Sequence, residues 1–315
     1  MSDTPLDPVR PTAAIERGQW VIDELHGWGT LASIVPPRFE SYVRIFHAAS
    51  GQDLRWSGVG PDPAPGALWV AGREVHGGNE HPERWAEAAA RWGTVFHPQA
   101  QWALLTSAYR QPKFGEDGWQ YNDPPQGEMN IDELAAAAAV LARHTSTPDD
   151  CLATVWEGFV DVADHTRYVA LTAVDDSASD PADDEGFPSI APVSRQMLAA
   201  AANPLLRLNE RASHLFELDI RALTDTSWRH ASGWSARLGE DTLTPQSIWP
   251  DDRAWFLASE IDFDSTIVAG PPELIRDLLA LAATGAIEAL EIPADADLTI
   301  TGDRINPMPE QPDYN

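Results

Sequence analysis

The stretch that decides the fold class runs from residue 253 to residue 292 and reads RAWFLASEIDFDSTIVAGPPELIRDLLALAATGAIEALEI. Alternating apolar residues predict a strand at 253–263, and the β-branched run predicts another at 266–269. Pro272 suits the first turn of a helix that extends to residue 282, and a last strand is expected at 286–292. Because these elements lack a regular strand–helix–strand alternation, the stretch predicts an α+β fold.

A similar mixture of elements is expected upstream. Helices are predicted at 13–26, 82–92, 130–144 and 194–202, and strands at 30–35, 39–47, 67–71, 152–156, 168–174 and 214–220. The helix at 130–144 is the clearest, because Asn130 and Glu133 form a capping-box pattern at its start. The strands at 30–35 and 39–47 are expected to pair. We therefore predict a mixed or antiparallel sheet flanked by helices.

Composition shifts suggest where the chain divides. Residues 175–192 contain six acidic residues and three prolines, and they carry too little apolar surface to order themselves. The expected division is a flexible tail at 1–12, an N-terminal α+β subdomain at 13–174, an acidic linker at 175–192, a C-terminal α+β subdomain at 193–306 and a flexible tail at 307–315. Pro-Asp-Asp recurs at 148–150 and 250–252, which would fit two related subdomains, although chance explains three shared residues better.

Charge is the strongest compositional signal. The 315 residues include 49 acidic and 21 basic side chains, for a formal net charge of −28. Such a surface repels phosphate groups, so we expect neither a nucleic-acid partner nor binding to a membrane. Three explanations of the acidity stay open: solubility combined with the composition of a high-GC genome, adaptation to high salt, and capture of a basic protein.

The single cysteine and the first residues bear on the compartment. Cys151 alone excludes an internal disulfide and any zinc site built on paired thiolates. Asp149 and Asp150 precede it, and their charges disfavour a reactive thiolate. The chain begins without the basic and apolar segments of a secretory signal. We therefore expect a cytoplasmic protein with an inert thiol.

Few motifs commit the chain to a chemistry. The phosphate-binding, dinucleotide-binding, zinc-protease and serine-hydrolase motifs are absent, and no cofactor is expected. The sharpest feature is the triplet Glu260, Asp262 and Asp264, which a strand would place on one face. Three carboxylates in a row suit a magnesium or calcium ion, or a division of acid and base roles. The alternative is the solvated face of an ordinary antiparallel strand.

Thirteen tryptophans are many for this length. Those on apolar stripes, such as Trp85, are expected in the core because each buries a large area. Others lie among glycines, prolines and charges, where an exposed aromatic could anchor a partner or a sugar. This second set comprises Trp119, Trp228, Trp234 and Trp249, and the last three are the expected partner-binding residues.

Several segments together resemble a known group of proteins. They are residues 34–42 (IVPPRFESY), His97-Pro98, Trp156-Glu157-Gly158, residues 249–255 (WPDDRAW) and residues 262–266 (DFDST). The combination is similar to a family of uncharacterised proteins from high-GC Gram-positive bacteria, over about residues 15–306. The resemblance implies a bacterial, cytoplasmic origin. It implies no activity and identifies no catalytic residue in this chain.

Two functions from different classes follow. The first is a non-enzymatic protein-binding role, as in immunity or regulatory proteins, supported by the acidity, the tryptophans and the absence of catalytic motifs. The second is a metal-dependent hydrolase that uses Glu260, Asp262 and Asp264. An enzyme should bring these carboxylates into a concave pocket with a histidine or arginine, whereas a binding protein should present a flat acidic patch with exposed aromatics.

Overall fold

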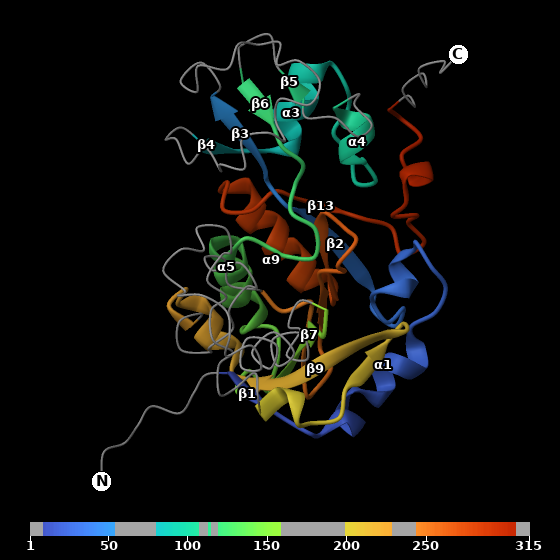
Figure 1. Ribbon diagram of the computed structural model, residues 1–315, viewed down its shortest axis with the longest axis vertical. Helices are drawn as coiled ribbons and strands as arrows, with labels where there is room; N and C mark the ends of the chain where they lie inside the picture. The colour runs from blue at the N-terminus through green and yellow to red at the C-terminus, as the bar shows by residue number, and fades with distance from the viewer. Residues whose placement is uncertain are drawn as a thin grey trace, which may run out of the picture.

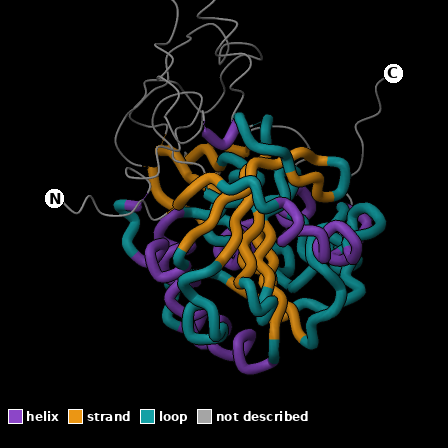
Figure 2. The backbone as a smooth tube through the Cα atoms, turned by 90° about the horizontal axis from the view of Figure 1, so that it is seen from below, coloured by secondary structure: helices purple, strands orange, loops and turns teal. Residues whose placement is uncertain are grey.

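The computed structural model describes residues 9–53, 80–106, 113–114, 119–158, 199–228 and 244–306. In these residues it shows an α+β fold with two antiparallel sheets, which confirms the predicted class (Figure 1). Figure 2 shows strands crossing the middle of the molecule, with helices and loops around them. None of the helices in the described part combines the length and apolar character needed to cross a bilayer.

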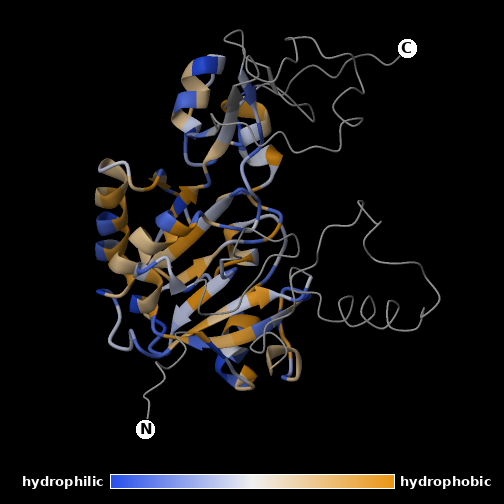
Figure 3. Ribbon diagram, turned by 60° about the vertical axis from the view of Figure 1, so that its left-hand side comes forward, coloured by the Kyte–Doolittle hydropathy of each residue, from blue (hydrophilic) through white to orange (hydrophobic). Residues whose placement is uncertain are grey.

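The main sheet contains nine strands within the described residues, in the order β1-β9-β7-β10-β11-β12-β2-β13, with β8 paired to β9. Their bounds are β1 Val9–Pro11, β2 Ser41–Phe46, β7 Cys151–Trp156, β8 Leu206–Leu208, β9 Arg211–Leu218, β10 Ser247–Pro250, β11 Phe256–Ala258, β12 Ser265–Gly270 and β13 Ala289–Glu291. Figure 3 shows apolar residues concentrated on these strands. A hydrophobic cluster lies on each face of the sheet, so both faces are covered.

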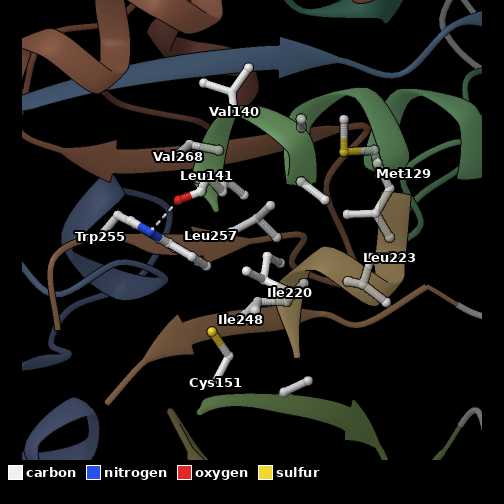
Figure 4. Packing of buried hydrophobic residues seen from close by; sticks show 14 of the residues in the cluster. Met129, Val140, Leu141, Cys151, Ile220, Leu223, Ile248, Trp255, Leu257 and Val268 are labelled. Carbon is white, nitrogen blue, oxygen red and sulfur yellow. Dashed lines mark hydrogen bonds between the residues drawn. The ribbon is translucent and has the colours of Figure 1, made fainter. Parts of the chain in front are cut away.

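One face packs against helices α5 (Ile131–Leu141) and α9 (Pro272–Ala283), together with the short 3-10 helix η5 (Ile220–Thr224). The indole Nε1–H of Trp255 donates to the carbonyl oxygen of Leu141 across 3.1 Å, so a buried polar group joins the sheet to α5 (Figure 4). Pairing satisfies a group that would be costly to bury alone. This face holds the larger hydrophobic core.

The other face is covered by short elements from the N-terminus and by the segment after β13. They are the 3-10 helices η1 (Ile15–Gly18) and η2 (Leu31–Ser33), helix α1 (Gln19–Glu24) and, further on, η6 (Ile300–Gly302). Trp20 of α1 meets Trp249 and Phe256 edge to face, and these two rings stack on each other. This thin cover leaves the ends of the central strands open to the pocket described below.

A second sheet in the described residues has the order β4-β3-β6-β5. Its strands are β3 Ala49–Asp53, β4 Glu80–Glu83, β5 Lys113–Phe114 and β6 Trp119–Tyr121, and helices α3 (Trp85–Trp92) and α4 (Trp102–Leu105) accompany it at the top of Figure 1. Phe46, Trp85 and Trp102 form its apolar centre.

Strands from both sides of the expected linker alternate in the main sheet. β7 lies between β9 and β10, and β2 lies between β12 and β13. The ranges 13–174 and 193–306 therefore share one sheet, while residues 175–192 lie outside the described part. Val9–Pro11 pairs with β9 as strand β1, so the expected tail differs from the structure there. The Pro-Asp-Asp runs occupy different places, one before β7 and the other starting at the end of β10.

Some of the helices and strands predicted from local sequence patterns are confirmed, and others are wrong. α5 begins after Asn130, whose side-chain oxygen accepts from the backbone of Asp132 and Glu133, and α9 opens with Pro272 as predicted. The predicted strand at 30–35 is wrong: the chain forms η2 there. The predicted strand at 253–263 is also too long, because β11 ends at Ala258 and the chain then turns.

Candidate functional site

A pocket of about 430 Å³ lies where β7, β9, β10 and β11 end on the thinly covered face of the main sheet. Its other walls come from residues 25–34, from the β8–β9 turn and from the loop after β11. The volume lies within the roughly 300–1,000 Å³ of small-molecule sites in proteins. The pocket is therefore large enough for more than a single ion.

Three hydroxyl side chains from neighbouring strands line the pocket: Thr154 of β7, Ser213 of β9 and Ser247 of β10. They are 1%, 5% and 7% exposed, and Ser247 pairs directly with Thr154 in the sheet. None of the three hydroxyls makes a hydrogen bond within the described part of the chain, and each oxygen keeps some access to the open space of the pocket. The three hydroxyls are therefore available to a polar group that enters the pocket.

Arg211, at the start of β9, forms a charged wall. Its Nε–H donates to Oε1 of Glu260 across 2.7 Å, and its Nη2 pairs with Asp262. The guanidinium carbon lies 5.8 Å from the ring centre of Trp156, which adds a cation–π contact. Two carboxylates and an indole thus hold one cation beside the pocket.

A fourth charge comes from the turn between β8 and β9. Leu208 pairs with Arg211, so Asn209 and Glu210 are the two turn residues, with φ of +45° and +71°. This left-handed geometry suits a tight hairpin, but it usually requires glycine at the second position. Asn209 donates through Nδ2 to the carbonyl oxygen of Ser33 across 3.0 Å and fastens the turn to η2. Glu210 is therefore held in a costly conformation at the pocket.

Trp28 stands at the pocket and is 80% exposed, the most exposed of the large apolar side chains in the described part of the chain. Gly27 and Gly29 flank it with φ of +78° and +74°. A side chain at position 29 would collide with Thr299, so the glycine is required for the close approach there. The turn presents the indole to solvent.

A chain of hydrogen bonds runs behind the pocket. Ser259, which contributes to the lining, contacts Thr266 at 2.5 Å between hydroxyl oxygens, and Thr266 contacts Nε2 of His47 at 2.8 Å. The other ring nitrogen lies 2.8 Å from the carbonyl oxygen of Pro125, which can only accept. Burial lowers the pKa of His47 to about 4, assisted by Arg44. The imidazole is therefore neutral, its Nδ1–H donates to Pro125, and Thr266 donates to Nε2.

The three predicted metal-binding carboxylates are separated. Glu260 and Asp262 lie together around Arg211, but Asp264 faces Arg44, with its carboxylate 3.2 Å from Nη2. The separation arises because the chain turns after Ala258 instead of continuing as a strand. In the described part of the chain, no three His, Cys, Asp or Glu side chains are grouped closely enough to hold a metal ion.

The predicted exposure of the partner-binding tryptophans is wrong where it can be examined. Trp228 and Trp249 are 3% and 1% exposed, and Trp234 lies outside the described residues. Trp249 is buried because it lies in β10 and stacks on Phe256. Sequence reasoning missed Trp28, whose signal was a glycine on either side. It also missed the hydroxyl row formed by Thr154, Ser213 and Ser247, because serine and threonine are mostly exposed and their burial cannot be predicted from residue type.

Comparison with protein-family models, with curated proteins and with solved structures found no match to this chain.

Proposed function

We propose that this protein is a non-enzymatic binding protein that captures a positively charged partner at the pocket. The observation that carries the proposal is the local charge balance: among the described residues that line the pocket, the charged ones are three carboxylates, Glu210, Glu260 and Asp262, and one guanidinium, that of Arg211. This excess of negative charge favours a cation over an anion or a neutral group.

The charge of the whole chain acts in the same direction. A net charge of −28 attracts cations over distances of about a Debye length, which is roughly 8–10 Å at moderate salt. Long-range attraction speeds association, whereas contacts in the pocket hold the partner. A basic protein, or a smaller cation, would gain from both.

Trp28 supplies the short-range contact that charge alone lacks. An exposed indole binds cations through the face of its ring, and tryptophan is favoured at the centre of binding sites. Trp156 already accepts Arg211 in this way within the same pocket. The aromatic and acidic groups therefore suit the same type of ligand.

A metal-dependent hydrolase is the weaker proposal. It requires Glu260, Asp262 and Asp264 at one site. The pocket brings Glu260 and Asp262 together beside Arg211, as that hypothesis expects, but Asp264 pairs with Arg44 away from the other two. Both remaining carboxylates are engaged by Arg211. The arrangement leaves the proposed metal ion without its third ligand.

Calorimetry with a short lysine–glycine peptide at low salt tests the binding function. We expect the wild-type protein to bind this peptide and to ignore the same peptide with acetylated lysines. Two unit charges about 4 Å apart interact by about 1 kcal/mol in water, so Glu210→Gln should weaken binding about fivefold.

The matched control is Glu273→Gln. It removes one carboxylate from an exposed position on α9, which covers the opposite face of the sheet. If both variants weaken peptide binding equally, only the overall charge attracts the peptide and the pocket has no specific role.

A further inference from the structure

We infer that the group bound in the pocket is a polyhydroxylated amine, an amino sugar in chemical class. The inference rests on the proposed capture of a cation and adds the hydroxyl row of Thr154, Ser213 and Ser247. Three kinds of group meet in the pocket and define this class of ligand: hydroxyls, carboxylates and aromatic rings.

The hydroxyl row is the feature that a simple cation does not explain. Each serine or threonine hydroxyl can donate one hydrogen bond and accept others. In Thr154, Ser213 and Ser247 these capacities are unused by described residues, although all three side chains are more than nine-tenths buried. A ligand that both donates and accepts would satisfy them, and sugar hydroxyls do both. An ammonium group without hydroxyls can only donate.

The side chains beside this row are already engaged. Gln246 also lines the pocket, but its Oε1 accepts from the backbone of Trp156 at 2.9 Å. Its Nε2 donates to the carbonyl oxygen of Thr244 at 2.9 Å. Ser259 is tied to Thr266. Thr154, Ser213 and Ser247 are thus the polar groups of the pocket's sheet side that remain for a ligand.

The charged and aromatic walls select among polyhydroxylated compounds. The excess of carboxylates disfavours phosphorylated or acidic sugars and favours an amine. Trp28 offers a flat apolar surface, against which the C–H face of a sugar ring can pack. A volume of about 430 Å³ accepts a ring rather than a single ammonium group.

Three probes separate these contributions: glucosamine carries hydroxyls and an ammonium, glucose carries hydroxyls alone, and cyclohexylamine carries an ammonium on a ring without hydroxyls. Their dissociation constants can be measured by tryptophan fluorescence on the full chain. We expect glucosamine to bind about tenfold more tightly than either of the others. Relative to cyclohexylamine this corresponds to one or two additional hydrogen bonds, and relative to glucose it corresponds to the attraction of the ammonium to the carboxylates.

The outcomes distinguish this inference from the proposed function. If cyclohexylamine binds as tightly as glucosamine, the hydroxyl row is unused and the inference fails, while cation capture stands. If glucose binds as tightly as glucosamine, the charge does not contribute to sugar binding and the inference fails, while the lysine–glycine peptide decides the proposed function. If none of the three binds, the amino-sugar inference fails, and the lysine–glycine peptide alone decides the proposed function.

Substitution of the hydroxyls provides the second test. Thr154→Val and Ser213→Ala remove hydroxyls with little change of shape, and each should weaken glucosamine binding severalfold without changing cyclohexylamine binding. Thr284→Val is the control, because its hydroxyl bonds to Leu281 at the end of α9, on the other face of the sheet. Equal glucosamine affinity in all three variants would overturn the inference.

Discussion

The Nε–H of Arg211 donates to Oε1 of Glu260 across 2.7 Å, which joins the start of β9 to the loop that follows β11. Asp262 contacts the same guanidinium through Nη2. Arg211 thus forms ion pairs with two of the three pocket carboxylates and lies near the place where a ligand cation would bind. A ligand cation must therefore compete with Arg211 for these carboxylates.

Removing this competitor should strengthen the binding of cations. In Arg211→Gln, Glu260 and Asp262 lose their internal partner, and the pocket becomes one charge more negative. We expect peptide affinity to rise by a fewfold at low salt and the gain to shrink as salt screens the charges. Calorimetry at two salt concentrations measures both effects. Weaker peptide binding in Arg211→Gln would mean that the arginine contributes directly to the site.

Substitutions of Glu210 in the β8–β9 turn should change the stability of the protein and its affinity for the peptide in different directions. Glu210 has a φ of +71°, which costs a residue with a side chain about 1 kcal/mol that glycine avoids. We therefore expect Glu210→Gly to unfold at higher urea concentration than the wild type while it binds the lysine–glycine peptide less tightly. Glu210→Gln, which keeps the side chain, should lose affinity without gaining stability. A destabilised Glu210→Gly would show that this turn carries no strain.

Glu133 should make stability fall as pH rises. It is buried at the start of α5, and its Oε2 has no hydrogen-bond partner among the described residues. Burial raises the pKa of Glu133 to about 7, which the charge of Arg84 opposes and the charges of Glu288 and Asp132 assist. The unfolded carboxyl loses its proton near pH 4.5, so the stabilisation is complete below that pH and is lost as pH rises through 7. Glu133→Gln should exceed the wild type at pH 8 by roughly 2–3 kcal/mol in urea unfolding. Equal stability of the two proteins at pH 8 would refute the assignment.

His47 should act in the opposite direction. Its folded pKa of about 4 lies below the ordinary value of 6.5, so its stabilisation is complete above pH 6.5 and is lost as pH falls toward 4. The loss amounts to about 3 kcal/mol. Because Glu133 opposes it over part of this range, urea unfolding is best measured in the Glu133→Gln background. A His47 ring proton signal that titrates near pH 6.5 in the folded protein would contradict this expectation.

The sequence predicted elements whose determinants are local. α9 follows from Pro272 and its apolar spacing, and α5 follows from the cap at Asn130. The order of the sheet could not be predicted in this way, because the placement of β7 between β9 and β10 depends on contacts between distant segments. The error at residues 30–35 has a similar origin: the run is largely apolar and suggests a strand, but Leu31–Ser33 form a 3-10 turn and Leu31 packs into the core on this face of the sheet.

The site was predicted less well than the fold. Glu260 and Asp262 were identified from their spacing, but their partner Arg211 lies far away in the chain and could not be named. Trp249 is followed by Pro250, Asp251 and Asp252, which is typical of a loop, yet it lies in β10 and is buried against Phe256. Exposure of a tryptophan depends on what covers it, and a single sequence does not contain that information.

Nitrogen–proton NMR of the indole groups tests the pocket most directly, because it reports where a cation binds. The lysine–glycine peptide is added to uniformly ¹⁵N-labelled protein, and Trp28→Phe and Trp156→Phe assign the two pocket signals. Trp102 is the internal reference, since its Nε1–H donates to Asp123 across 2.9 Å and it belongs to the separate core beside the second sheet. We expect saturable shifts of the Trp28 and Trp156 signals and no shift of the Trp102 signal. Binding heat from the peptide without a shift at either pocket indole would contradict it.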